Sequence, residues 1–185
     1  MNNARHDILL WENFCKGDHA ALGELFRRHY SYLYRYGSKI CTDTYLLEDV
    51  IQELFIELWQ QKTAAPAVSV RAYLLRALKY KLFRALQKQQ PLADADKLSE
   101  QGHFELSHET FIITEQENNE NAGRVIAAMN QLSDRQKEII YLKFYQDMSY
   151  EEVAEIMNIN YQAARNLLYQ AIKSLRNRLM QWWLF

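Results

Sequence analysis

The sequence predicts an all-α protein of two small helical domains, a helical bundle and a helix-turn-helix, joined by an acidic linker. Five glycines and two prolines in 185 residues leave few turn-forming residues for a sheet protein. Leu, Ala, Glu, Gln, Lys and Arg, which favour helices, dominate the remainder. The hydrophobic fraction of 49% suffices to bury a core. We expect domains over residues 1–90 and 122–185, and the linker over 91–121.

Four helices are predicted for the first domain, near residues 7–15, 18–40, 44–61 and 69–87. Asp18 can cap the second helix, whose apolar face is expected to continue to Ile40. The third helix carries acids and no base from Asp43 to Glu57. The fourth is the reverse, because residues 71–88 carry bases and no acid. We therefore expect the fourth helix, and not the third, to face nucleic-acid phosphate.

Residues 92–122 read as a linker, because acids far outnumber bases and helical periodicity is weak. Several of its residues are too apolar for a free spacer, so we expect part of the linker to dock on a domain. These residues are Phe104, Leu106, Phe111, Ile112 and Ile113.

The second domain shows the pattern of a helix-turn-helix. Ser133 with Gln136, and Ser149 with Glu152, have the spacing of capping boxes and mark two helix starts. The helix after Ser149 is short and ends at Asn158, which tolerates the left-handed conformation of a tight turn. Asn160 is expected to cap the next helix, which would lie in the DNA major groove.

This last helix has no acid from Tyr161 onward. Gln, Asn and Arg side chains can each make two hydrogen bonds to a base edge. The residues expected near base edges are Tyr161, Gln162, Arg165, Asn166 and Tyr169. Further along, Lys173, Arg176 and Arg178 suit phosphate contacts. The alternative is that this polar face is only solvated.

The stretch Leu47–Trp59, with the sequence LEDVIQELFIELW, resembles the most characteristic segment of the extracytoplasmic-function sigma factors. The resemblance implies that this helix docks on the clamp coiled coil of the polymerase beta-prime subunit. The residues it points to are Glu48, Asp49, Gln52, Glu53 and Trp59. Without the resemblance the segment reads as a core helix with one solvated side, and Leu54, Phe55 and Leu58 are expected in the core either way.

Residues 70–79 resemble the next helix of the family, which melts the promoter and reads the minus 10 element. Aromatic and basic residues suit this task, since exposed bases stack on aromatic rings. The candidates are Arg71, Tyr73, Arg76, Lys79, Tyr80, Lys81 and Arg84. Tyr80 and Arg84 depart from the common Asn and Asp. The preceding loop, residues 62–69, is either a flipped-base pocket or a simple connector.

Residues 131–176 resemble the domain that reads the minus 35 element, with departures at Ala163, Ala164, Leu167 and Gln170. The resemblance implies a sigma factor that directs promoter-specific initiation. Its implied partners are core RNA polymerase, through the beta-prime coiled coil and the beta flap, promoter DNA and an anti-sigma factor. No cofactor and no small-molecule substrate are expected.

Two other classes of protein compete with this interpretation. A stand-alone dimeric helix-turn-helix regulator could dimerise through the tail Trp182–Phe185, but it gives no reason for an acidic helix. An enzyme is disfavoured, because the five histidines lack metal-ligand spacing and there is no glycine-rich phosphate loop. Cys15 and Cys41 are expected to be reduced thiols. Neither a signal peptide nor a membrane span is recognisable, so a cytoplasmic protein without membrane insertion is expected.

Overall fold

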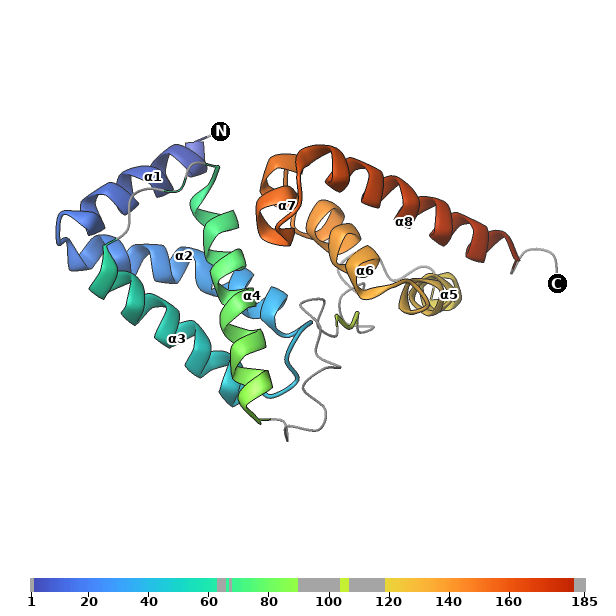
Figure 1. Ribbon diagram of the computed structural model, residues 1–185, viewed down its shortest axis with the longest axis horizontal. Helices are drawn as coiled ribbons and strands as arrows, with labels where there is room; N and C mark the ends of the chain where they lie inside the picture. The colour runs from blue at the N-terminus through green and yellow to red at the C-terminus, as the bar shows by residue number, and fades with distance from the viewer. Residues whose placement is uncertain (1, 63–65, 67, 90–103, 107–118, 182–185) are drawn as a thin grey trace. The chain divides into compact units, whose positions relative to one another are not determined.

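The computed structural model describes residues 2–62, 66, 68–89, 104–106 and 119–181 (Figure 1). Within these residues the secondary structure is helical and no strand is present, which confirms the predicted fold class. The chain divides into two compact units. The first contains the first four helices together with Glu155–Asn158, and the second contains the rest of the C-terminal helices.

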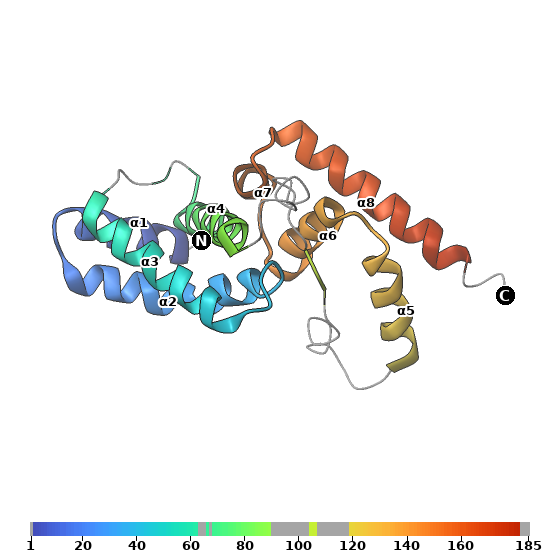
Figure 2. The same cartoon turned by 60° about the horizontal axis from the view of Figure 1, so that its bottom comes forward.

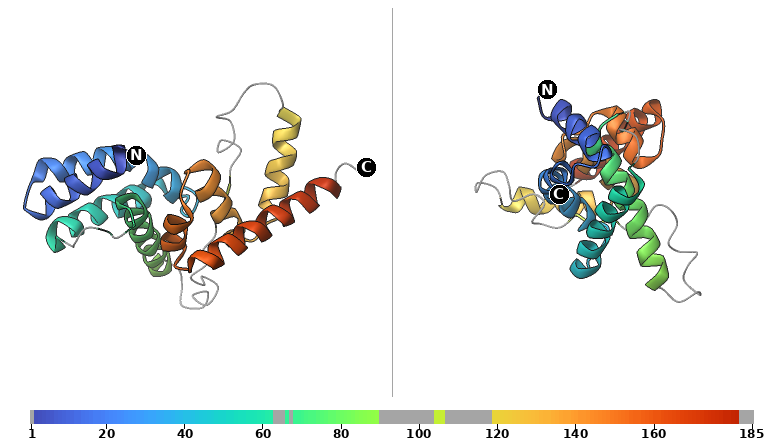
Figure 3. Two further views of the ribbon diagram at one scale, coloured as in Figure 1. Left: turned by 90° about the horizontal axis from the view of Figure 1, so that it is seen from above. Right: turned by 90° about the vertical axis from the view of Figure 1, so that its left-hand side faces the viewer.

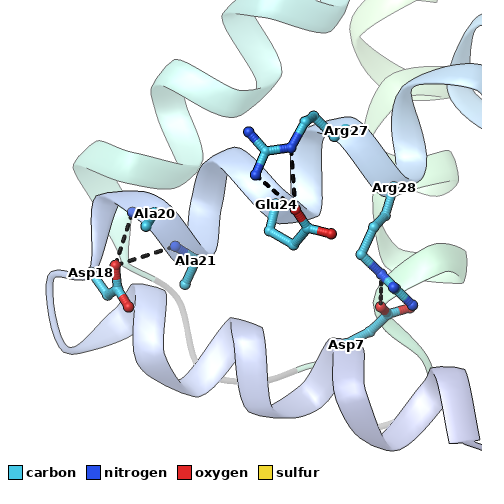
Figure 4. A network of polar contacts seen from close by, with 7 residues as sticks. All are labelled: Asp7, Asp18, Ala20, Ala21, Glu24, Arg27 and Arg28. Atoms are coloured by element: carbon cyan, nitrogen blue, oxygen red, sulfur yellow. Dashed lines mark hydrogen bonds and ion pairs between the residues drawn. The ribbon is translucent and has the colours of Figure 1, made fainter.

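The first unit is built on α1 (Asn2–Cys15), α2 (His19–Gly37), α3 (Thr44–Gln61) and α4 (Val70–Gln89). α2 packs against the other three helices; α4 crosses α2 and α3 (Figure 1), and α1 lies along α2 (Figure 2). Asp18 caps α2 as predicted, since its carboxylate accepts hydrogen bonds from the N–H groups of Ala20 and Ala21 at 2.8 and 3.2 Å (Figure 4).

The prediction that α2 continues to Ile40 is wrong, because the helix ends at Gly37. Beyond it, the N–H of Ser38 bonds to the carbonyl of Tyr34, and those of Ile40 and Cys41 bond to the carbonyl of Gly37. A Cβ atom at Gly37 would overlap Cδ1 of Leu47. Glycine therefore allows the end of α2 to approach the first turn of α3. Ile40 stays buried although it lies outside the helix.

The core of the first unit is apolar, and its largest fully buried side chains come from all four helices. They are Trp11, Phe14, Leu25, Leu33, Tyr36, Leu47, Ile51, Leu74, Leu75, Leu78 and Leu82. Burial of this many large side chains, at about 1.5–3 kcal/mol each, is the main force that holds the four helices together.

A polar cluster ties α1 to α2 at the edge of this core. Nε of Arg28 donates a hydrogen bond to Oδ1 of Asp7 at 2.8 Å (Figure 4). Nε2 of His29 lies 3.2 Å from Oδ2 of the same carboxylate, and His29 is buried. Burial lowers the pKa of His29, and the positive charges of Arg28 and Arg71 lower it further, whereas Asp7 opposes the shift. His29 is therefore favoured in its neutral form.

The second unit contains α5 (Asn119–Asn130), α6 (Asp134–Ile140), the π-helical turn η3 (Tyr141–Tyr145), α7 (Tyr150–Met157) as far as Ala154, and α8 (Tyr161–Gln181). Both predicted capping boxes are present. The Ser133 hydroxyl accepts from the N–H of Gln136, and the Gln136 side chain accepts from the N–H of Ser133. Ser149 and Glu152 form the same reciprocal pair, at 3.2 and 2.8 Å.

The turn between α7 and α8 also follows the prediction. Asn158 has φ of 52°, and the Asn160 side chain accepts a hydrogen bond from the N–H of Ala163 at 2.7 Å. Ala154 and Ala164 are both buried, as expected for helices that cross closely. Of the adjacent residues Ala171 and Ile172 on α8, Ala171 is fully buried and Ile172 is 43% exposed.

The expectation that part of the linker docks on a domain is confirmed for Phe104 and Leu106. Both side chains are buried, and the Phe104 ring packs edge-on against Tyr141, with 5.6 Å between ring centroids. The remaining apolar linker residues, 111–113, lie outside the described part of the chain, as does the tail 182–185.

Candidate nucleic-acid interface

α3 separates an apolar inner face from an acidic outer face. Six of its residues are buried: Leu47, Val50, Ile51, Leu54, Phe55 and Leu58. The core role expected for the last three is therefore confirmed. Asp49, Gln52 and Glu53 are exposed on the outer face, and Glu48 is half-buried beside them. The Asp43 carboxylate caps the helix by accepting from the N–H of Leu46 at 3.1 Å.

Trp59 lies at the C-terminal end of α3, and its ring is covered by neighbouring side chains. Its ring stacks on His19, with 3.7 Å between centroids, and Nζ of Lys62 lies 4.9 Å from its centroid. The half-buried Trp59 thus packs where α3 ends against the start of α2. Two outer-face residues were not singled out from the sequence, Tyr45 at 81% and Ile56 at 57% exposure. Their spacing of four residues from Asp49 and Gln52 was the signal that could have found them.

α4 presents an aromatic and basic outer face. Tyr80, at 43% exposure, and Arg84 are the exposed candidates there. Arg76 lies over the Tyr80 ring at 5.8 Å, and Lys79 lies over the Phe83 ring at 5.9 Å. The sequence reasoning missed Phe83, although its position four residues after Lys79 places both on one side of the helix. The structure thus brings cations and aromatic rings together along two adjacent rows.

Three other candidates on α4 contact neighbours inside the first unit. The Arg71 guanidinium lies 4.1 Å from the centroid of the Tyr32 ring on α2. Tyr73 packs edge-on against Trp11 of α1 at 5.3 Å between centroids. Lys81 forms an ion pair with Glu57 of α3. All three are half-buried, so their side chains are engaged in holding α4 on the bundle.

The N-terminal half of α8 carries all five candidates for base contacts on its exposed face, opposite the buried Ala164, Leu168 and Ala171. These exposed residues are Tyr161, Gln162, Arg165, Asn166 and Tyr169. Tyr161 packs edge-on against Tyr150 of α7, with 5.7 Å between centroids. Nε2 of Gln162 donates a hydrogen bond to Oδ1 of Asn166 at 3.2 Å.

The basic side chains in the C-terminal half of α8 differ in their surroundings. Lys173 and Arg176 are exposed, as phosphate contacts would need. Arg178 instead donates from Nη1 to the side-chain oxygen of Gln131 at 2.6 Å. This bond joins α8 to the segment that follows α5, where the two helices meet (Figure 3).

The described residues contain no cluster of three or more His, Cys, Asp and Glu side chains that could hold a metal ion. Among the helices described, none is long and apolar enough to cross a membrane. Burial raises the pKa of the thiols of Cys15 and Cys41, which favours the protonated form.

Comparison with known proteins identifies both units. A family model described as sigma-70 region 2 matches residues 25–91, and one described as sigma-70, region 4 matches residues 122–175. The ECF RNA polymerase sigma factor SigK of Mycobacterium ulcerans is 21% identical over 173 residues, covering 92% of this chain and 91% of that protein. SigV, an RNA polymerase sigma factor of Bacillus subtilis, is 40% identical over 52 residues, covering 28% of this chain and 31% of SigV.

Two solved structures share the fold. CnrH, in complex with the cytosolic domain of CnrY, has a TM-score of 0.62 and 22% identity, covering 95% of this chain and 98% of CnrH. The sigma factor RpoE from Bartonella quintana, in complex with the anti-sigma factor NepR, has a TM-score of 0.59 and 19% identity, covering 85% of this chain and 96% of RpoE. The alternative of a stand-alone regulator receives no support from these matches. The two sigma-70 regions in order, and relatives that match almost end to end, show that the chain belongs to the extracytoplasmic-function sigma factors, which direct promoter-specific transcription.

Proposed function

We propose that this sigma factor divides its work among three helix faces: α3 docks on core RNA polymerase, α4 binds the minus 10 element, and α8 reads the minus 35 element. In this proposal, the domain of residues 1–90 docks on core RNA polymerase and melts the promoter. The domain of residues 122–185 recognises the upstream element, and residues 91–121 connect the two domains. The observation that carries the proposal is the segregation of charge, because α3 is acidic outside while α4 and α8 expose bases without acids.

On α3, Asp49, Gln52 and Glu53 form a row that a basic helix can pair with along its length. Tyr45 and Ile56 lie at the two ends of this row and add apolar contact area. A mixed acidic and apolar face of this kind fits a basic amphipathic partner helix, as in the clamp coiled coil of the beta-prime subunit.

On α4, exposed Tyr80 and half-buried Phe83 offer rings on which separated bases can stack, and Arg76, Lys79 and Arg84 lie beside them for the backbone. Stacking suits single strands because every base has a π face, whereas paired bases hide it. This supports contact with the melted downstream element.

On α8, the exposed amide and guanidinium groups occupy the turns that a recognition helix presents to base edges, and Lys173 and Arg176 follow at the level of the phosphates. The C-terminal domain is also proposed to contact the polymerase beta flap. Binding through two modules held on one polymerase gives higher affinity than either module alone.

An anti-sigma factor is part of the proposal. RpoE of Bartonella quintana was solved with such a protein, and this chain shares its fold. The exposed apolar residues of the proposed binding faces, such as Ile56 and Tyr169, favour a protein that covers them when the sigma factor is idle. We further propose that the protein works in the cytoplasm and catalyses no reaction of its own.

The decisive test is binding of the purified protein to bacterial core RNA polymerase, followed by transcription from fragmented genomic DNA. Discrete start sites are expected. The double substitution Asp49→Ala with Gln52→Ala should weaken polymerase binding about tenfold or more without changing helicity. Glu12→Ala with Asn13→Ala is a matched control, since it removes an exposed acid and amide from α1. Equal binding by both double variants would refute the docking assignment.

A further inference from the structure

Gln162 and Asn166 form a hydrogen-bonded amide pair near the start of α8. Nε2 of Gln162 donates to Oδ1 of Asn166 at 3.2 Å, and both side chains are exposed. Residues four apart lie one above the other on a helix surface. The bond therefore joins two amides on the outward face of the helix and does not anchor either of them in the core.

In this bond the nitrogen end of the Gln162 amide points toward Asn166. A primary amide offers two N–H donors at one end and a carbonyl acceptor at the other. With one N–H given to Asn166, Gln162 keeps its second N–H and Oε1 for a ligand. If the Gln162 amide flipped alone, two carbonyl oxygens would come together, which is repulsive. With Oδ1 of Asn166 facing Gln162, the pair therefore presents an acceptor and a donor in a set order.

Adenine matches this order in the major groove. Its edge offers the N6 amino donor beside the N7 acceptor, whereas guanine offers two acceptors there. Resting on the function proposed above, we propose that Gln162 reads an adenine of the upstream element and that Asn166 is its positioning residue. Gln162 takes the base contact because it is the second residue of α8, and the N-terminal residues of a recognition helix lie nearest the bases.

The test is a promoter library with a randomised upstream element, transcribed by core polymerase with the wild-type protein or a variant. One adenine position should dominate with the wild type, and Gln162→Ala should reduce that preference about 5- to 150-fold, the range for loss of a two-point base contact. Gln162→Glu should change the preference at the same position to cytosine, because a carboxylate can only accept and cytosine offers its N4 amino group.

Variants at Asn166 separate positioning from base contact. Asn166→Asp keeps an acceptor for Gln162, so the adenine preference should persist even as repulsion from phosphate lowers total activity. Asn166→Ala removes the acceptor and should weaken the preference. Gln170→Ala is the matched control, because Gln170 is an exposed amide two turns further along α8. Helicity and thermal unfolding should be the same for all these variants.

An upstream motif that does not respond to Gln162→Ala or Gln162→Glu would overturn the inference while leaving the sigma function intact. If Gln162→Glu kept the adenine preference and showed no preference for cytosine, the inference would also be overturned and the sigma function would stand. If the wild-type protein gave no discrete start sites with core polymerase, the proposed function and this inference would fail together.

Discussion

His29 should make the first unit less stable as the solution is acidified below neutral pH. Its pKa is lowered from the ordinary value of 6.5 mainly by burial, and also by Arg28 and Arg71, while Asp7 opposes the shift. As the pH falls through 6.5, His29 therefore becomes protonated in the unfolded chain while it stays mostly neutral in the folded unit. Stability contributed by neutral His29 is therefore complete above pH 6.5 and is lost as the pH falls below it.

The magnitude follows from linkage. If folded His29 stays neutral throughout, lowering the pH from 7.5 to 5.5 costs about 1.4 kcal/mol of unfolding free energy, because pH 5.5 lies one unit below the pKa of the unfolded histidine. Any protonation of the folded form makes the loss smaller. His29→Gln removes this dependence and leaves the other histidines in place, so the difference between the two proteins isolates His29.

The assay is urea unfolding at a series of pH values, followed by tryptophan fluorescence in a background carrying Trp182→Phe and Trp183→Phe. The remaining tryptophans, Trp11 and Trp59, both lie in the first unit. The advantage of wild type over His29→Gln should shrink as the pH falls. A difference that stays constant, or that grows on acidification, would contradict this prediction and mean that the effect of Asp7 on the pKa of His29 outweighs that of burial.

Three further predictions concern packing and capping, each measured by urea unfolding of the purified protein. Gly37→Ala should destabilise the first unit by about 1–3 kcal/mol because the added Cβ would overlap the buried Leu47; an unchanged midpoint would show that Leu47 can move away. Phe104→Ala should destabilise the second unit by about 3 kcal/mol through loss of a buried ring, and no loss would place Phe104 outside its core. Ser149→Ala should cost about 1 kcal/mol by removing a helix cap, whereas Ser149→Thr, which keeps the hydroxyl, should cost less.

Features that depend only on neighbours along the chain could be predicted from the sequence. Both capping boxes, the Asp18 cap and the turn at Asn158 were predicted correctly, because each uses groups within a few residues of one another. The buried side of α3 and the exposed side of α8 were also predictable, since helical periodicity assigns each residue to a face before any partner is known.

Which candidate side chains are available for binding depends on how distant segments pack together. Sequence grouped Arg71, Tyr73 and Lys81 with the exposed Tyr80 and Arg84 by charge and aromaticity alone. In the structure, Arg71, Tyr73 and Lys81 contact residues on α2, α1 and α3, which lie far away in sequence.

The same reason governs Trp59, which stacks on His19, and the choice of Ala171 over Ile172 as the core residue of α8. The docking of Phe104 on Tyr141 was foreseen only as an apolar segment in need of a surface. Local spacing fixes a face, but only the packing of distant segments shows which residues of that face stay free to bind.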